Sequence, residues 1–233
     1  MNGLDVIVIG GGSGIGLAAA RLLRQRGARP TIVGRDAAKL AAALAGLGAG
    51  ARAETADAAD RASIDALFAR LAPFDHLVLA ASGGRGAGDF ASLAPEALRL
   101  GFEGKFWAHW NAAQAALPHL AKQGSITFVS AASSRLANPG TSGLAAINGA
   151  IERMVPTLAR ELAPLRVNAV SPGVIDTPWW DGKPPGMFEA ASLRAPLARP
   201  GRAEEVADAI VFLIGNAFVT GVTLDVDGGL HLT

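Results

Sequence analysis

The chain has 233 residues, half of them apolar, which suffices for one α/β domain that covers both faces of a buried parallel sheet. A net charge of +1 gives no electrostatic basis for binding nucleic acid or an anionic membrane, and the absence of cysteine excludes a disulfide framework and a thiolate metal site. The four histidines show no metal-ligand spacing, and no apolar run is long enough to span a membrane or resembles a secretion signal. We therefore expect a cytoplasmic protein that holds no metal.

Strand-like apolar runs alternate with segments of helical spacing along the whole chain. In chain order we expect a strand at 6–9, a helix at 17–26, a strand at 31–33, a helix at 37–47, a strand at 52–55, a helix at 62–71, a strand at 76–79, helices at 94–100 and 106–121, a strand at 125–129, a helix at 144–162, a strand at 167–170, a helix at 203–214 and a strand at 222–226. The proline- and glycine-rich segment 176–201 is expected to be the least regular. This alternation predicts a single α/β domain, 1–233, with a doubly wound parallel sheet of about seven strands and helices on both faces.

The first expected strand runs into a glycine-rich turn and then into a helix, the order that a dinucleotide site requires. Glycines let the backbone approach a pyrophosphate, and the helix N-terminus offers free N–H groups and a partial positive charge. An ordinary glycine-rich turn is the alternative. The dinucleotide interpretation is favoured by the context, and its expected contacts are Gly10, Gly12, Ser13, Gly14, Ile15 and Gly16.

Several motifs in one order resemble the short-chain dehydrogenase/reductase family across nearly the whole chain. They are the spacing Gly10-x-x-x-Gly14-x-Gly16, the sequence Asn-Ala-Val-Ser-Pro-Gly at 168–173, Thr177-Pro178, and the segments 199–206, 220–221 and 225–229. The resemblance implies a Rossmann fold, an oxidoreductase that uses NAD(P) on a small molecule, and homo-dimers or homo-tetramers. It also implies cofactor contacts at Asp57, Ala81, Pro172, Gly173, Val174 and Thr177. One departure is Ile9, where the family usually has threonine.

The end of the second expected strand indicates which dinucleotide binds. Gly34 is followed there by Arg35, and a small residue leaves room for a 2′-phosphate that a guanidinium binds through paired, charge-assisted hydrogen bonds. Asp36 is open to two interpretations, an acidic contact to the ribose of NAD or the N-cap of the next helix. We expect NADP, with NAD as the alternative, and a further phosphate contact from the Ser13 hydroxyl.

The resemblance also implies an acid–base centre of Asn, Ser, Tyr and Lys, and this centre is missing. The sequence contains no tyrosine. Counting back from the segment 157–162, the tyrosine position falls on Leu144 and the lysine position, one helical turn later, on Asn148. The asparagine position falls near Gly101 and the serine position near Ala131, although a shifted serine is available close by at Ser130, Ser133 or Ser134.

Other residues are candidates to replace part of this centre. Asn148 is either a ribose contact or only a polar helix residue, and Ser133, beyond the fifth strand, either orients a substrate oxygen or caps a turn. We name Ser133 and Asn148 as the catalytic candidates. Trp179 and Trp180 lie in the segment 176–201 that the resemblance implies to be a substrate lid, where they line a pocket or pack the lid.

Lys105, close to the asparagine position, is expected to be solvated or to point toward a neighbouring helix.

Two functions remain open at this stage. The first is an NADP-dependent oxidoreductase with unorthodox acid–base chemistry, since hydride transfer depends above all on proximity and orientation. The second is a catalytically inactive NADP-binding sensor or partner subunit, which the loss of tyrosine and lysine favours. Neither the substrate nor the direction of the reaction follows from the sequence.

Overall fold

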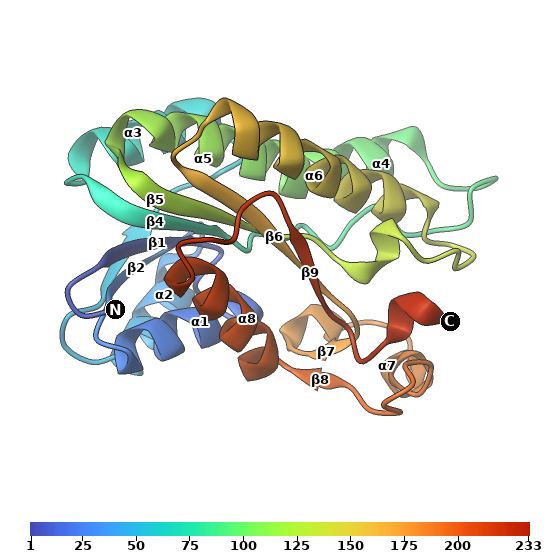
Figure 1. Ribbon diagram of the computed structural model, residues 1–233. Coiled ribbons are helices and arrows are strands. Elements are labelled where there is room, and N and C mark those ends of the chain that lie inside the picture. The colour runs from blue at the N-terminus through green and yellow to red at the C-terminus, as the bar shows by residue number, and fades with distance from the viewer.

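A seven-stranded, all-parallel sheet forms the centre of the computed structural model, which describes all 233 residues (Figure 1). The strand order is β3-β2-β1-β4-β5-β6-β9. The strands are β1 (Asp5–Ile9), β2 (Arg29–Gly34), β3 (Arg52–Thr55), β4 (Phe74–Leu79), β5 (Leu120–Val129), β6 (Arg166–Pro172) and β9 (Thr223–Val226). Seven parallel strands were expected from apolar runs that alternate with helices, and this prediction is confirmed.

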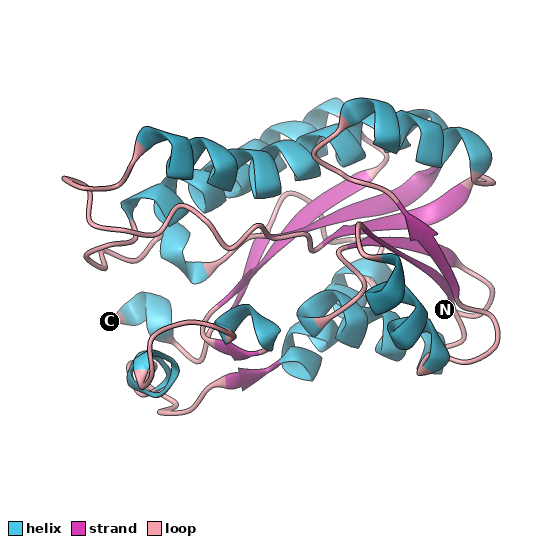
Figure 2. Ribbon diagram, turned by 180° about the vertical axis from the view of Figure 1, so that it is seen from behind, coloured by secondary structure: helices cyan, strands magenta, loops and turns pink.

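Helices cover both faces of the sheet, so two separate cores form (Figure 2). One face carries α1 (Gly14–Gln25), α2 (Ala37–Ala45) and α8 (Ala203–Gly215), and the other carries α3 (Arg61–Arg70), α4 (Pro95–Phe102), α5 (Ala108–Ala116) and α6 (Ser142–Glu161). Successive strand residues point to opposite cores, as Ile7 and Val8 do, which is why these strands read as continuous apolar runs. None of the helices is long and apolar enough to cross a membrane.

The strand order reverses between β1 and β4, where Ile9 pairs with Leu79. The chain leaves β1 toward α1 on one face and β4 toward α4 on the other, and in doubly wound sheets such a divergence makes a crevice beyond the carboxyl ends of the strands. Ligands of doubly wound sheets bind at such a reversal. The glycine loop and the segment after β4 therefore face each other across the expected binding site.

The region between α4 and β5 differs from the prediction. Instead of a helix at 106–121, a π-helical turn (Glu103–Trp107) joins α4 to α5, and α5 ends at Ala116. Pro118 then lies in a 3-10 turn, because proline cannot donate to the helical ladder, and β5 begins at Leu120, which pairs with Phe74.

The segment 176–201 is more ordered than expected. Two short strands, β7 (Ile175–Asp176) and β8 (Gly201–Arg202), pair in parallel and bring its two ends together, and a short helix, α7 (Met187–Ser192), lies between them. The segment is thus a closed loop at the carboxyl side of β6. Its role as a substrate lid stays a prediction.

Candidate functional site

The glycine loop is packed to backbone contact, which explains its composition. Gly10 has a φ of +82°, and a Cβ there would lie 2.6 Å from the backbone nitrogen of Ala81. A Cβ on Gly16 would collide with the carbonyl oxygen of Gly10. Ser13 takes the extended N-cap conformation of α1, but its hydroxyl makes no capping hydrogen bond. The first N–H groups of α1 and the Ser13 hydroxyl are therefore available to an anion.

The end of β2 separates the two interpretations of Asp36. Its carboxylate Oδ1 accepts a hydrogen bond of 2.9 Å from the backbone N–H of Lys39, so Asp36 is the N-cap of α2. The Arg35 side chain beside it is exposed. At Gly34, the nearest atom to an added Cβ is a methyl of Leu40 at 3.6 Å. The acidic group is engaged, whereas the guanidinium is free to take a ligand.

The remaining cofactor candidates lie around the same crevice. Asp57 follows β3, and its Oδ1 accepts from the N–H of Ala59 at 3.0 Å. Thr177, after β7, packs against the glycine loop, since its Cβ lies 3.4 Å from the position of a Cβ on Gly14. Gly173 is pressed against Asp227 and donates its N–H to the carbonyl of Val226, on the neighbouring strand β9. The segment Pro172–Thr177 is thus brought beside the loop 10–16, which lies far away in sequence.

The two catalytic candidates contact each other. Asn148, a buried residue of α6, donates through Nδ2 to the Ser133 hydroxyl at 3.1 Å and to the carbonyl of Leu144 at 2.9 Å. Its Oδ1 is buried and accepts no hydrogen bond within the chain. A buried amide oxygen of this kind is an acceptor for a ligand donor such as a ribose hydroxyl.

A second set of polar side chains surrounds the carboxyl end of β5, and neither Glu152 nor the hydrogen bonds of this set were predicted from the sequence. Lys105, in the π-helical turn, donates through Nζ to the carbonyl of Ser130 at 2.9 Å. Glu152, one helical turn after Asn148, accepts from the hydroxyls of Ser130 at 2.6 Å and Ser134 at 2.8 Å through Oε1. We call Lys105, Ser130, Ser134 and Glu152 the Lys105–Glu152 cluster. The expectation of a solvated Lys105 is wrong, because the π turn directs its ammonium toward the end of β5.

Burial controls the ionisation of this cluster. It lowers the pKa of Lys105 to about 8, although the charge of Glu152 acts in the opposite direction. Glu152 is itself held by Arg135, with Nε 3.4 Å from Oε2, and Arg135 also binds Asp225. A lysine with such a pKa exchanges its proton near neutral pH.

His109 of α5 lies close enough to Lys105 to feel its charge, and it is uncharged at neutral pH. Its Nε2 donates to the carbonyl of Ala81 at 2.9 Å, while Nδ1 is buried with no partner in the chain. Burial, reinforced by the charge of Lys105, lowers the pKa of His109 to about 3. His109 thus fixes the segment after β4 to α5 as a neutral hydrogen-bond donor.

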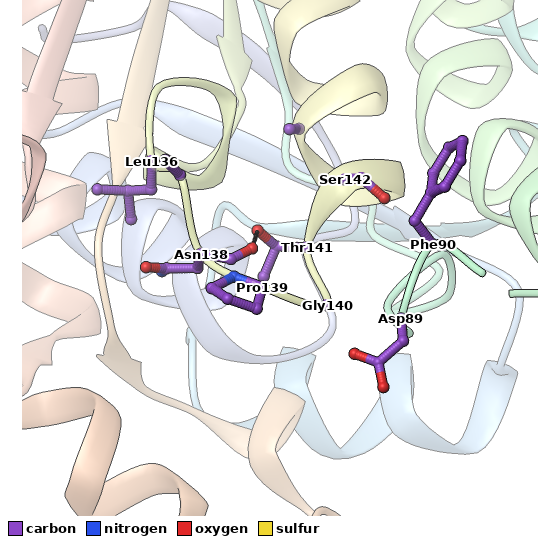
Figure 3. A pocket seen from close by; sticks show the side chains of 10 residues that line it. Asp89, Phe90, Leu136, Asn138, Pro139, Gly140, Thr141 and Ser142 are labelled. Atoms are coloured by element: carbon purple, nitrogen blue, oxygen red, sulfur yellow. Dashed lines mark hydrogen bonds between the residues drawn. The ribbon is translucent and has the colours of Figure 1, made fainter. Parts of the chain in front are cut away.

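A cavity of about 380 Å³ opens beside the start of α6 (Figure 3). Asp89 and Phe90, from the segment after β4, lie on one side of it, and residues 136–142, from the segment after β5, form the rest of the wall. Ala145, next to Leu144, also lines it. The first turn of α6 therefore forms part of the wall.

The tryptophans of the predicted lid contact each other, and Trp179 reaches the segment after β4. The ring of Trp179 packs edge-on against Trp180, at 4.9 Å between centroids, and its Nε1 lies 3.4 Å from the position of a Cβ on Gly84. The Nζ of Lys183 lies 4.1 Å from the Trp179 ring centre. The segment after β7 thus contacts the segment after β4 across the crevice.

One cluster of possible metal ligands exists, but its atoms are already engaged. Asp225, Asp227 and His231 have ligand atoms within 4.8 Å of one another. Asp227 accepts from the N–H groups of Gly229 and His231 and lies 2.7 Å from His231 Nδ1, while Asp225 pairs with Arg135. These contacts fasten the C-terminal turn to β9.

Comparison with known proteins identifies the family. A family model described as enoyl-(acyl carrier protein) reductase matches residues 10–231. The 3-oxoacyl-(acyl-carrier-protein) reductase of Bos taurus is 35% identical over 234 residues, which cover 97% of each chain. The cis-4-hydroxycyclohexanecarboxylate dehydrogenase of Sinomonas cyclohexanicum is 35% identical over 235 residues, which cover 96% of this chain and 94% of that protein.

A solved structure extends the match to three dimensions. The short chain dehydrogenase from Burkholderia cenocepacia J2315 in complex with NADP superposes with a TM-score of 0.90 at 31% identity and covers 98% of both chains. This chain belongs to the short-chain dehydrogenase/reductase family. It is an oxidoreductase of the short-chain dehydrogenase/reductase type.

Proposed function

We propose that this short-chain dehydrogenase/reductase binds NADP(H) and transfers hydride to or from a small organic substrate with acid–base residues of its own. The observation that carries the choice of cofactor is the end of β2. Asp36 is engaged as a helix cap, and the exposed Arg35 is the charged group that remains for the cofactor. A guanidinium next to a glycine suits the 2′-phosphate that distinguishes NADP from NAD.

The hydrogen-bonding groups at the start of α1 and on α6 suit this cofactor. A Cβ on Gly10 or Gly16 would collide with the backbone of Ala81 or of Gly10, so these glycines permit the tight loop that leaves the first N–H groups of α1 open to a pyrophosphate. We assign the pyrophosphate to Gly12, Gly14, Ile15 and Gly16, and the ribose to the unpartnered Oδ1 of Asn148. Asp57 and Ala81 flank the adenosine half in this assignment, and Pro172, Gly173, Val174 and Thr177 flank the nicotinamide. NADPH supplies the hydride, whereas the protein positions it and manages the proton.

We place the substrate between the carboxyl end of β5 and the cavity beside the start of α6, which the segments after β4 and β5 line. Ser133, which lies beyond β5 and before the cavity wall begins at Leu136, orients a substrate oxygen in this assignment, because its hydroxyl is held by Asn148. The similar Burkholderia cenocepacia dehydrogenase was solved in complex with NADP, and the Bos taurus relative is named for the reduction of a 3-oxoacyl group. Both support a polar double bond as the reacting group.

A second candidate function is a sensor or partner subunit that binds NADP(H) without turnover. The observation that favours it is the complete absence of tyrosine from the sequence. The two candidates share the cofactor site and differ in turnover, so a single set of experiments separates them.

The test is a calorimetric titration of the protein with NADPH and NADH, repeated with Arg35→Ala. We expect NADPH to bind more tightly than NADH, and Arg35→Ala to weaken NADPH binding by about 10- to 100-fold, the size of one or two charge-assisted hydrogen bonds. Binding of NADH should be unaffected. The matched control is Arg26→Ala, an exposed arginine at the far end of α1.

A panel of carbonyls, imines and enones, followed by NADPH absorbance, then tests turnover. Oxidation of NADPH with any member supports the oxidoreductase, and tight binding without turnover across the panel supports the sensor. Failure to bind either nucleotide would overturn both.

A further inference from the structure

Lys105 occupies an unusual place for a lysine. It is the central residue of the π-helical turn Glu103–Trp107, and such turns occur frequently at functional sites. The turn is close-packed, since a Cβ on Gly104 would lie 3.0 Å from Gly83 Cα in the segment after β4. Its backbone is therefore fixed against the crevice, and the side chain reaches the residue that follows β5.

The Lys105 ammonium has protons to give. Its Nζ carries three, and the carbonyl of Ser130 takes one at 2.9 Å. That carbonyl lies at the carboxyl end of β5, on the edge of the sheet where ligands of this fold bind. Asn148 and Ser133, which we assign to the cofactor and the substrate, lie at the same end of β5.

The charged and titratable groups that face Lys105 come from two helices. Glu152 of α6 favours its charged form, and His109 of α5 is neutral. Ser130 links the pair, because its carbonyl accepts from Lys105 while its hydroxyl donates to Glu152 at 2.6 Å. Glu152 also accepts from Ser134 and pairs with the half-exposed Arg135, so the cluster extends from the buried ammonium to the surface.

We propose that Lys105 is the proton donor of the reduction and that Glu152 is the positioning residue that keeps it charged. This inference rests on the proposed function. When a substrate carbonyl carbon accepts the hydride from NADPH, the π electron pair of the C=O bond moves to oxygen. That oxygen takes a proton as an N–H bond of Lys105 breaks. The substrate is reduced to an alcohol, NADPH is oxidised to NADP+, and the neutral amine regains a proton from water.

The first test needs no turnover, because the chain contains only four lysines, Lys39, Lys105, Lys122 and Lys183. Protein labelled with carbon-13 at lysine Cε gives four signals, which single Lys→Arg variants assign. The Lys105 signal should titrate near pH 8, and Glu152→Gln should move the titration to lower pH, since it removes the stabilising negative charge. Addition of NADP+ should shift the Lys105 signal and leave that of Lys122 in place.

The second test compares Lys105→Met and Lys105→Arg with the control Lys122→Met, an exposed lysine of β5. Both Lys105 variants should bind NADPH like the parent protein and lose about 10²- to 10⁴-fold in kcat, the usual contribution of proton transfer. The parent kcat should fall as pH rises through about 8, because only the charged lysine donates, and Glu152→Gln should move this fall to lower pH.

Each outcome decides a separate point. Recovery of turnover in Lys105→Arg would overturn the proposal, since arginine keeps the charge but does not release a proton. An unchanged kcat and pH profile in Lys105→Met would also overturn it. A parent protein that binds NADPH but reduces no substrate would overturn the proposed oxidoreductase activity. A Lys105 signal that does not shift when NADP+ is added would overturn only the placement of Lys105 beside the cofactor.

Discussion

Two regions of the candidate site are built differently, one from backbone and the other from side chains. Around the glycine loop, recognition depends on backbone: the close approach of Gly10 to Ala81, the packing of Gly16 and the free N–H groups of α1. At the end of β5, side chains meet instead, because Lys105 of the π turn and Glu152 of α6 both bind Ser130.

Because of this difference, the two regions should tolerate substitution differently. A backbone cradle is built from strand ends and a helix start, so altering it disturbs the sheet itself. A side-chain cluster rests on the same strands, but its residues can be exchanged one at a time. Cofactor binding and proton transfer should therefore be separable by substitution in this protein.

The largest effect is expected at Gly10. Gly10→Ala forces a positive φ on a residue with a Cβ and drives that Cβ into the backbone of Ala81. We expect NADPH affinity to fall by at least about 100-fold and the free energy of unfolding to fall by about 2–4 kcal/mol. Calorimetry and urea denaturation measure both.

Gly48→Ala is the matched control, because Gly48 has a φ of +73° but nothing within 4 Å of an added Cβ. It should show the small cost of the φ angle and leave NADPH binding intact. Equal losses of NADPH affinity and of unfolding free energy in the two variants would show that close packing of the glycine loop is unimportant. This result would contradict a cofactor site that depends on backbone packing.

Low pH is expected to lower the free energy of unfolding through His109, the neighbour of Lys105. His109 has a pKa of about 3 in the folded protein, against 6.5 for the free group. Between these values the unfolded chain binds a proton that the folded chain does not, so the stabilisation is complete above pH 6.5 and is lost as pH falls. Each pH unit in this window costs up to about 1.4 kcal/mol.

His109→Gln removes the titration but keeps a donor for the Ala81 carbonyl. Between pH 7.5 and 4.5, the parent protein should lose about 2–3 kcal/mol more unfolding free energy than this variant. His119→Gln, in the 3-10 turn after α5, serves as the control and should behave like the parent. An identical pH dependence in His109→Gln would contradict a neutral, buried His109.

The smallest effect is expected at the predicted lid, which belongs to neither region and reaches the segment after β4 through Trp179. Trp179→Leu loses the edge-on contact with Trp180 and the Lys183 ammonium over its ring, worth about 0.5–1 kcal/mol of stability. Because Trp179 packs toward Gly84, substrate KM should rise while the Kd for NADPH stays constant. Phe218→Leu, fully exposed in the connection between α8 and β9, is the control. A change in NADPH affinity without a change in KM would assign Trp179 to the cofactor instead.

The fold could be predicted from the sequence because strands buried on both faces read as apolar runs and the helices between them keep their spacing. The helix at 106–121 was misjudged because Leu120 owes its strand conformation to Phe74, a partner distant in sequence. The strand–glycine–helix order of the glycine loop follows from a local pattern, but its close contact with Ala81 does not. The cap formed by Asp36 on α2 was one of the two interpretations that the sequence left open.

The Lys105–Glu152 cluster could not be predicted in the same way. A lysine within a helical segment is solvated by default, and only the π turn, packed on Gly83, directs Lys105 inward. Glu152 did carry a signal, since four residues separate it from Asn148 and place both on one face of α6. That spacing suggests a neighbour of Asn148, but not its hydrogen bonds with Ser130 and Ser134.

The most direct test of separate cofactor and proton regions is to measure NADPH affinity and kcat together in Arg35→Ala and Lys105→Met. We expect Arg35→Ala to weaken NADPH binding but to retain turnover at saturating NADPH, and Lys105→Met to bind NADPH normally but to lose turnover. Loss of NADPH affinity in Lys105→Met, or loss of saturated turnover in Arg35→Ala, would contradict the separation of the two regions.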